Sequence, residues 1–475
     1  MSGEQHNQNV FPKIGFADPV HGLIKIDGRL RCIIDTKEFQ RLRNIKQLGL
    51  EHFVYPCANG TRFEHSLGVC YLVQQLLDHL RKEQPHLNIT KKDWYSVLIA
   101  ALLHDVGHGP FSHLYEEAVN GFNSDKSRPY KHEHQSNRIL ERIFEKDSVK
   151  VVFEGIIDDK ELTFIKELID PYKNIFSPGS TWPYKGRTKD KSFLYEIVAN
   201  SDTGIDLDKV DYIQRDCIYL AMNTGIQWSR CLETIRVYKD DSTNLNRLAF
   251  RTKVKTNLND IINTKRNLHI KAYKHKCLKL LDEMFLKVMY DSSSCLTFGK
   301  SKLSLCDAWK DLDTFIEIDD SIFQMILFSD VKELKDSRDL LERIVERDIP
   351  KFCGHAEVAD KAIKLDFEIY LEHMIKNMYG EQSGPRFYTS IIKLDYGVQC
   401  GNPLKKIPFY TKNEEDACHV SDDFTDGNKN KVTILLLFAD KHKDSNFFSD
   451  MLKKFCEEKG KKYLGSDDCP NIELD

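Results

Sequence analysis

Apolar residues recur at helical spacing along most of the chain from residue 18 onward. The positions of Leu67, Leu72, Leu76 and Leu80 give one apolar face and predict a helix over about 64–82. The next helix is expected directly after Thr90, which suits the N-cap position, and its run 97–103 is apolar on nearly every side. Further helices are expected at about 192–200, 208–222, 257–291, 307–348 and 366–378.

Alternation replaces the helical period in two parts of the chain. Residues 235–252 alternate and predict a small hairpin that turns at 240–244. After Gly380, strands are expected at 387–394, 407–410 and 432–438, followed by an amphipathic helix at 446–459. The chain is therefore predicted to be mainly α. We expect a tail at 1–16, a helical domain at 17–378, a smaller mixed α/β lobe at 379–465 and a tail at 466–475.

Composition narrows the class of protein. The 475 residues include 69 basic and 73 acidic side chains, a net charge of −4, which argues against a basic surface over the whole molecule. No stretch reaches the ~18 apolar residues of a membrane span, and the polar N-terminus is not a signal peptide. The 13 cysteines are scattered without a CxxC pair, as in reduced nuclear or cytoplasmic proteins.

Histidines are concentrated in one part of the chain. Eight of the 17 fall between His65 and His134. His104 and Asp105 end the apolar helix, and His108 follows one turn later. Imidazole and carboxylate together suit a divalent metal ion, with a further carboxylate expected from Asp206, Asp208 or Asp211. A single histidine or carboxylate is usually only a solvated or hydrogen-bonded group. The joint pattern H…HD…D beside apolar helices is more informative, since buried polar groups need partners.

This pattern resembles the HD-domain metal-dependent phosphohydrolases. The motifs DPVHG, IIDTKEFQRLRNIKQLG, NGTRFEHSLGV, HDVGHGPFSH, WPYKGR, GIDLDKVDY and LHIKAYKHK are similar to those of the deoxynucleoside triphosphate (dNTP) triphosphohydrolases that carry a SAM domain ahead of the HD domain in vertebrates. The resemblance runs from about residue 18 to 412, with the HD motifs at 60–225. Because only 17 residues precede it, we expect the SAM domain to be missing.

The resemblance implies a role for each residue that matches a motif. It assigns His65, His104, Asp105 and Asp208 to one divalent metal ion, which would be Zn, Fe or Mn, with Mg accompanying the nucleotides. It makes His132 the general acid, with His108 at the reacting phosphate and Glu116 orienting the catalytic histidine. The remaining substrate-binding residues are Gln47, Leu48, Arg62, His113, Lys209, Tyr212, Asp216, Lys265, His269 and Tyr273.

The same resemblance implies regulation by nucleotides at subunit interfaces. A nucleotide-induced homotetramer is expected, activated by GTP and dNTPs. The guanine-reading set would be Asp35, Gln40 and Arg43; the rest of the regulatory sites would use Val54, Arg236, Arg251, Lys253, Asn257, Lys276 and Lys412. Polar contacts are lost at Ile14, Ala17 and Leu23, and the segment 352–366 matches poorly. Activation is therefore expected to differ in nucleotide preference or strength.

Three departures fall in the catalytic motifs. Lys265 replaces an arginine that contacts the γ-phosphate in the family, which keeps the charge but loses the bidentate fork. Lys274 replaces a glutamine, and Glu116 replaces an aspartate, with one more methylene to reach the catalytic histidine. Activity is expected to survive these changes.

The leading interpretation is a dNTP triphosphohydrolase that lowers dNTP pools and thereby restricts viruses. One alternative is an HD phosphohydrolase acting on a monophosphate or cyclic nucleotide, although Arg62, Lys209 and Tyr212 match a triphosphate clamp. Another is a non-catalytic, nucleotide-gated scaffold or weak single-stranded nucleic-acid binder, which could use the basic interface residues. Metal analysis and product chromatography would distinguish the three.

Overall fold

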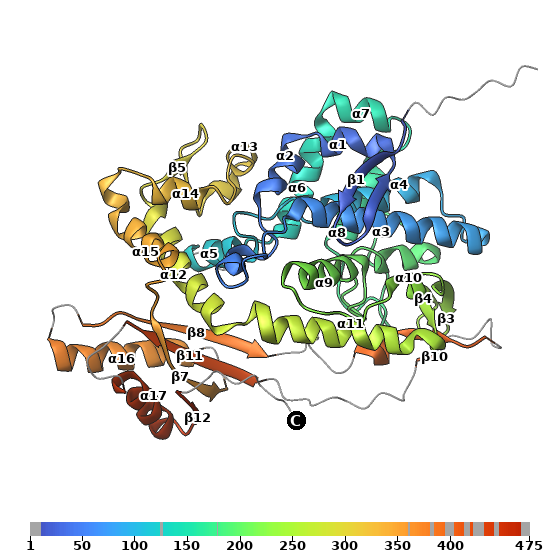
Figure 1. Ribbon diagram of the computed structural model, residues 1–475. Helices are drawn as coiled ribbons and strands as arrows, with labels where there is room; N and C mark the ends of the chain where they lie inside the picture. Colours follow the sequence, from blue (N-terminus) through green and yellow to red (C-terminus); the bar gives the residue numbers. More distant parts are fainter. Residues whose placement is uncertain are drawn as a thin grey trace, which may run out of the picture.

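The computed structural model describes residues 11–123, 127–177, 179–359, 362–380, 384–394, 403–412, 419–420, 432–440 and 446–466. Most of its elements are helices, and they form a large body with a smaller lobe beneath it (Figure 1). No helix in these ranges is long and apolar enough to cross a membrane. Of the two expected tails, residues 1–10 and 467–475 lie outside the described ranges.

The first half of the body carries most of the predicted site residues. Its helices are α1 (Arg31–Ile34), α2 (Lys37–Gln40), α3 (Arg62–Glu83), α4 (Lys91–Leu103), α5 (His113–Phe122), α6 (His132–Glu145), α7 (Asp147–Phe153), α8 (Asp159–Ile169), α9 (Leu207–Tyr219) and α10 (Trp228–Leu232). Thr90 accepts a hydrogen bond from the backbone of Asp93, which completes a capping box and confirms the predicted start of α4. Residues 97–103 of α4 are all buried.

The second half of the body is more broken than the sequence predicted. The expected helix at 257–291 is divided into α11 (Lys255–Leu268), a π-helical turn (His269–Tyr273) and α12 (Lys276–Ser293). The expected helix at 307–348 is five pieces, of which the longest is α15 (Lys335–Val345). The others are α13 (Leu312–Phe315), α14 (Ile322–Leu327) and the turns Ala308–Lys310 and Lys332–Leu334. Apolar periodicity continues across these breaks, so it does not reveal them.

The described residues also form four sheets. The hairpin β3 (Arg236–Asp240) and β4 (Leu245–Arg251) confirms the predicted turn, where Asn244 adopts a φ of 58°. The strand predicted at 407–410 exists as β9 (Pro408–Tyr410), but it pairs in parallel with β4 in the body, and β10 (His419–Val420) joins its other side. An alternating pattern predicts a strand without identifying its partner, so the assignment of this strand to the lobe was wrong.

The lobe is built on an antiparallel sheet of four strands in the order β12-β7-β11-β8. These are β12 (Lys462–Gly465), β7 (Lys351–Val358), β11 (Val432–Ala439) and β8 (Phe387–Leu394). The sheet therefore takes a strand from before residue 379, the expected boundary. Side chains at 435, 437 and 439 pack with α16 (Ile363–Tyr379) and α17 (Phe447–Glu458), whereas Ile434, Leu436 and Phe438 join the core of the body.

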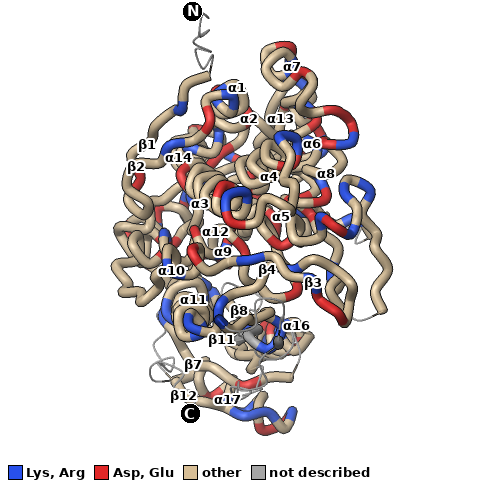
Figure 2. The backbone as a smooth tube through the Cα atoms, turned by 90° about the vertical axis from the view of Figure 1, so that its right-hand side faces the viewer, with Lys and Arg blue, Asp and Glu red and all other residues tan. Residues whose placement is uncertain are grey.

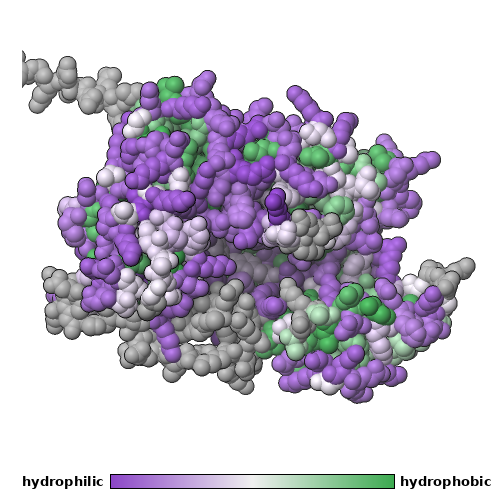
Figure 3. All heavy atoms as spheres, turned by 180° about the vertical axis from the view of Figure 1, so that it is seen from behind, coloured by the Kyte–Doolittle hydropathy of each residue, from purple (hydrophilic) through white to green (hydrophobic). Residues whose placement is uncertain are grey.

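Two short hairpins were not predicted. The strands β1 (Ile14–Asp18) and β2 (Gly22–Ile26) pair with each other, so residues 14–16 are not part of a tail. β5 (Thr297–Phe298) and β6 (Leu303–Ser304) form the other hairpin. Basic and acidic residues are interspersed over the whole tube in Figure 2, in keeping with the small net charge. The face in Figure 3 is mainly hydrophilic, and its apolar residues form separate patches.

Candidate active site

Four predicted metal ligands converge from three helices in the interior of the body. His65 lies on α3, Asp208 lies on α9, and His104 and Asp105 follow the last turn of α4. The Nε2 atoms of His65 and His104 are 3.3 Å apart. The Oδ1 atom of Asp208 lies 3.1 Å from Nε2 of His65 and 3.6 Å from Nε2 of His104, and Oδ2 of Asp105 lies 3.4 Å from both imidazoles.

Hydrogen bonds on the far side of each ring fix both histidines. Nδ1 of His104 lies 2.8 Å from the carbonyl oxygen of Ala101, and Nδ1 of His65 lies 2.8 Å from Oδ2 of Asp211. When Nδ1 donates to these oxygens, Nε2 of each ring is directed into the cluster with its lone pair. Such outer contacts are typical of metal-binding histidines.

The cluster is suited to a cation. Burial alone would lower the pKa of His65, but its hydrogen bonds with Asp208 and Asp211 and the nearby Asp105 raise it to about 10. Two imidazole nitrogens and two carboxylates thus surround a point where positive charge is favoured. This donor set fits a divalent ion such as Zn, Fe or Mn, and His65, His104 and Asp208 are close enough to share one.

A buried ionic network supports His65 from behind. Asp211 accepts hydrogen bonds from Nε of Arg215 at 2.8 Å, and its Oδ1 lies 2.6 Å from Nε2 of His21. Arg215 also donates to Asp18 at 2.8 Å. Gly68 on α3 leaves room for this network, because a Cβ there would lie 2.0 Å from Oδ1 of Asp211 and 2.4 Å from Nη2 of Arg215.

Replacing Gly68 by alanine is therefore expected to disturb both stability and the orientation of His65. The free energy of unfolding should fall by about 1–3 kcal/mol, as for other overpacked sites, and metal content should fall with it. Thermal melts and metal analysis would measure both. Gly225→Ala is the matched control, because only Asp260, 3.9 Å away, approaches a Cβ at that position. Equal stability of the two variants would show that the network has room to adjust.

Three further histidines form a second cluster beside the first. The rings of His108 and His132 stack with centroids 3.9 Å apart, and His113 meets both rings edge-on. Nδ1 of His132 lies 2.8 Å from Oε2 of Glu116. The extra methylene of glutamate at this position therefore does not prevent contact with the catalytic histidine. Burial lowers the pKa of His132, but the hydrogen bond to Glu116 and the charges of Glu133, Asp105 and Glu116 together outweigh it and raise the pKa overall.

Asp105 connects the two clusters. Its Oδ2 atom faces His65 and His104, whereas Oδ1 lies 3.3 Å from Nε2 of His108. Nη1 of Arg62 donates to Oδ2 at 2.6 Å. Burial and the charge of Arg62 hold the pKa of His108 well below its usual range, so this ring is neutral, and neither of its nitrogens has a hydrogen-bond partner among the described residues. His108 is thus available to a ligand.

The loop between α4 and α5 is constrained so that these groups meet. A Cβ at Gly107 would lie 2.2 Å from the carbonyl oxygen of His132, so glycine permits α6 to approach. Phe111 and Ser112 both have positive φ values, 57° and 59°, which cost energy in residues other than glycine. Hydrogen bonds compensate: the Phe111 amide donates to Asp320 at 2.6 Å, and Ser112 accepts from Nε of Arg62 at 3.0 Å.

A cavity of about 730 Å³ opens beside both clusters. Most of the predicted catalytic and substrate-binding residues line it, namely Gln47, Leu48, Arg62, His108, His113, His132, Tyr212, Asp216, His269 and Tyr273. Two of the predicted metal ligands, Asp105 and Asp208, line it as well. Lys209 and Lys265 are not among its lining residues; Nζ of Lys209 lies 2.5 Å from Asp206 instead. Lys274 lines the cavity and donates to the carbonyl of Lys393 on β8, so the lobe contributes one wall.

The predicted regulatory residues are exposed or partly exposed, except Asn257, which is buried. Nε of Arg43 donates to Gln40 at 2.8 Å and its guanidinium stacks over Phe63, while the exposed Asp35 accepts from Arg31. In the second set, the charges of Arg236 and Arg251 both act on Tyr410, two residues before Lys412. Lys253 lies in the turn Thr252–Val254, Asn257 lies on α11 and Lys276 begins α12. Val54 follows the turn Gly49–Phe53.

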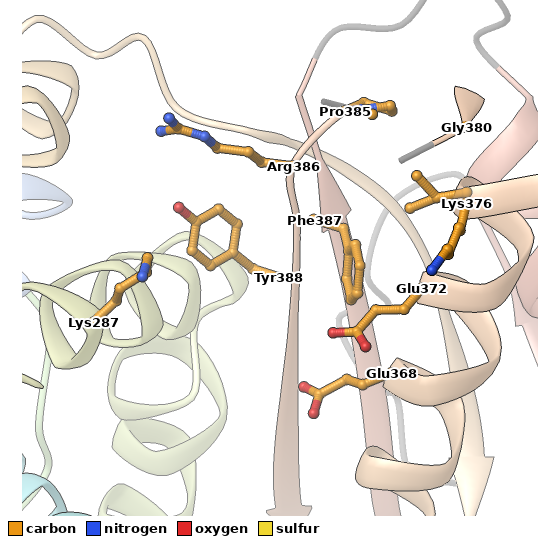
Figure 4. A pocket seen from close by; sticks show the side chains of 11 residues that line it. Lys287, Glu368, Glu372, Lys376, Gly380, Pro385, Arg386, Phe387 and Tyr388 are labelled. Atoms are coloured by element: carbon orange, nitrogen blue, oxygen red, sulfur yellow. The ribbon is translucent and has the colours of Figure 1, made fainter. Parts of the chain in front are cut away.

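A second cavity, of about 740 Å³, lies in the lobe between α12, α16 and β8 (Figure 4). Glu368 and Glu372 project from α16 toward the side of β8 that carries Phe387, whereas Arg386 and Tyr388 point toward Lys287 on α12. None of the predicted site residues is among the described residues that line this cavity.

Sequence reasoning did not single out several residues that shape the active site. Asp211 was one of three alternatives for a ligand, and it instead supports His65. Arg215, which holds Asp211, could have been suspected only from the charge of a face of α9 that is otherwise buried. His21 lies in the turn between β1 and β2, where no sequence pattern indicates a contact with Asp211. Glu51 lines the cavity although its place in a polar turn gives no sign of burial.

Comparison with known proteins agrees with this geometry. Residues 62–177 match the HD domain family. The human deoxynucleoside triphosphate triphosphohydrolase SAMHD1 is 35% identical over 466 residues, which cover 94% of this chain and 71% of the human protein. The chicken (Gallus gallus) protein of the same name is 37% identical, covering 84% of this chain and 66% of its own length. The SAMHD1 homolog of Dictyostelium discoideum is 31% identical over 83% of this chain and 70% of its own. This chain is therefore an enzyme of the SAMHD1 family of deoxynucleoside triphosphate triphosphohydrolases.

Proposed function

We propose that this chain hydrolyses dNTPs to a deoxynucleoside and intact triphosphate. The observation that carries the proposal is the single cavity in which Asp105 joins a metal-type cluster to three histidines and an arginine. The names of the relatives describe the same reaction. Consumption of dNTPs would lower their cellular pools. Because depletion of dNTPs can restrict viruses, we extend the proposal to viral restriction.

The phosphate end of the cavity suits a highly charged ligand. Arg62 and Tyr212 line it, and His113 lies beside His132. Lys209 and Lys265 would have to reorient to join them. His65, His104, Asp105 and Asp208 would hold one divalent ion, which supplies a Lewis acid for the α-phosphate and lowers the pKa of water. Mg would accompany the nucleotide.

His132 is the proposed general acid. Its Nδ1 faces Glu116 at 2.8 Å, which leaves Nε2 as the atom able to reach a ligand in the cavity. The raised pKa keeps the imidazolium populated near neutral pH, and the proton on Nε2 can pass to the 5′-oxygen of the leaving deoxynucleoside. Stacking on the neutral His108 fixes the plane of the ring.

The sugar is proposed to bind beside Asp216 and Tyr273. The hydroxyl group of Tyr273 donates to Oδ2 of Asp216 at 2.5 Å, and Gln47 and Leu48 line the same cavity. Burial raises the pKa of Asp216 to about 6. This carboxylate can accept a hydrogen bond from a 3′-hydroxyl, while the ring of Tyr273 occupies the space that a 2′-hydroxyl would need.

Product analysis tests the function directly. Incubation with dATP or dGTP, with and without GTP, should release deoxynucleoside and triphosphate in equal amounts. Release of pyrophosphate or orthophosphate instead would contradict the proposal and favour another HD phosphohydrolase activity. Nucleotide binding without any turnover would favour the scaffold alternative, including weak single-stranded nucleic-acid binding.

We further propose that nucleotides regulate the enzyme by causing its subunits to assemble. We expect GTP together with a dNTP to convert the chain into a homotetramer, through Asp35, Gln40 and Arg43 and the basic residues near Tyr410. Size-exclusion chromatography with light scattering should show the mass rise on addition of nucleotide. Arg43→Ala should reduce this assembly without changing metal content. Hydrolysis of dNTPs at constant mass would show that activity does not require assembly.

A further inference from the structure

Glu51 is a buried carboxyl group without a partner at the wall of the active-site cavity. The residue is 1% exposed, and neither of its carboxylate oxygens has a hydrogen-bond partner among the described residues. Its backbone carbonyl accepts hydrogen bonds from the amides of Val54 and Tyr55 at 2.8 and 2.7 Å, which hold the turn in place. A buried polar group left unpaired is costly, so a ligand that pairs with it gains affinity.

The charged neighbours of Glu51 do not satisfy it. Asp216 and Asp282 act on it as like charges, and Lys279 is the one cation among the groups that act on it. Nζ of Lys279 lies 2.7 Å from Asp282, which is its own partner. Burial, followed by the two aspartates, raises the pKa of Glu51 to about 8, so the side chain is mainly a neutral carboxylic acid at pH 7.

Glu51 lies at the sugar end of the cavity. Among charged groups, Asp216 acts on the pKa of Glu51 most strongly, and the charge of Glu51 itself acts on Tyr273 and Tyr55. Arg62, His108 and His132, at the phosphate end, are not among the groups that act on it. A nucleotide with its α-phosphate at the histidines and its sugar beside Asp216 would therefore place its base toward Glu51.

We propose that Glu51 is a specificity-determining residue that hydrogen-bonds to the edge of the nucleobase; this inference rests on the proposed function. A neutral carboxyl group presents one donor and one acceptor side by side. Adenine matches it with its amino group and N1, and cytosine matches it with the equivalent pair. Guanine and thymine match it with a ring N–H and a carbonyl oxygen. Glu51 would accordingly bind all four bases and would favour a base whose edge carries both the donor and the acceptor.

The test compares dATP with purine 2′-deoxyriboside triphosphate, which lacks the 6-amino group. The native enzyme should prefer dATP by about tenfold in kcat/KM, the value of one hydrogen bond. In Glu51→Leu this preference should disappear. Glu51→Gln, which keeps a donor and an acceptor, should retain it to within about threefold. A preference that is absent in the native enzyme, or unchanged in Glu51→Leu, would overturn the proposal. If Glu51 were purely structural, its loss would lower kcat/KM for the two nucleotides equally and leave the preference as it is.

Two further measurements keep the outcome decisive. Thermal melts would show whether Glu51→Leu is folded; if it is not, Glu51→Met provides an unbranched apolar replacement of similar length. If the native enzyme releases no triphosphate from any dNTP, the proposed function fails by itself. Dissociation constants of the same two nucleotides, measured by calorimetry, would then decide the role of Glu51 with the same expected ratios.

Discussion

Replacing His104 and Asp105 together by alanine is expected to abolish both metal binding and dNTP hydrolysis. The double variant loses two of the four groups that converge in the body, including the carboxylate that links the two histidine clusters. A bound Lewis acid stabilises a phosphoryl transition state by several kcal/mol, so turnover should fall by at least about 10³-fold. Metal analysis of the purified protein and product chromatography would measure the two losses.

Stability must be followed in the same experiment. Removal of Asp105 leaves the buried guanidinium of Arg62 without its partner at 2.6 Å, which is expected to cost about 3–5 kcal/mol of unfolding free energy. Asp208→Asn retains that ion pair, and the Asp208 side chain is 28% exposed, so it separates metal loss from instability. His86→Ala, at an exposed position on the surface, is the control for histidine loss. Turnover at the native level in a metal-free double variant would show that the HD pair is structural.

The four residues predicted as metal ligands do converge in the structure, and Asp208 shows how far the sequence alone could select them. Asp206, Asp208 and Asp211 are equally plausible ligands by composition, and only the resemblance to known enzymes selected Asp208. The structure explains the division of roles. Asp206 accepts from the backbone amide of Lys209 at the start of α9, Asp208 faces the histidines, and Asp211 lies one turn later behind His65. The three-residue spacing of Asp208 and Asp211 by itself places both on one face of the helix.

The fold was predictable where a pattern is local. The capping box at Thr90 and Asp93 and the strand at 387–394 agree with the structure residue by residue. Strand pairing is not local. This is seen at β9, which was predicted to belong to the lobe but pairs with β4 in the body. The burial of Glu51 could not be predicted for the same reason. It depends on elements distant in sequence, here α9 and α12.

Loss of His132 is expected to lower kcat sharply while leaving the metal in place. His132→Ala removes the group that faces the cavity through Nε2, and general acid catalysis typically contributes about 10²–10⁴-fold. Because His132 is not one of the four converging ligands, metal content should remain at the native level. Steady-state kinetics with metal analysis would test both statements. A variant that loses metal together with activity would instead assign His132 to the metal centre.

The pH profile provides an independent measure of the same role. If the imidazolium is the acid, kcat/KM falls as pH rises through the pKa of His132, which Glu116 raises. Glu116→Gln removes the carboxylate charge and should move this alkaline limb to lower pH, whereas Glu116→Asp, which restores the charge, should move it back toward the native position. Glu133→Gln is the matched control, on the same helix as His132. The Glu133 carboxylate lies 3.5 Å from Nδ1 of His132 without a hydrogen bond, so the alkaline limb of this variant should shift in the same direction by a smaller amount. An alkaline limb that Glu116→Gln leaves in place would show that another group protonates the leaving oxygen.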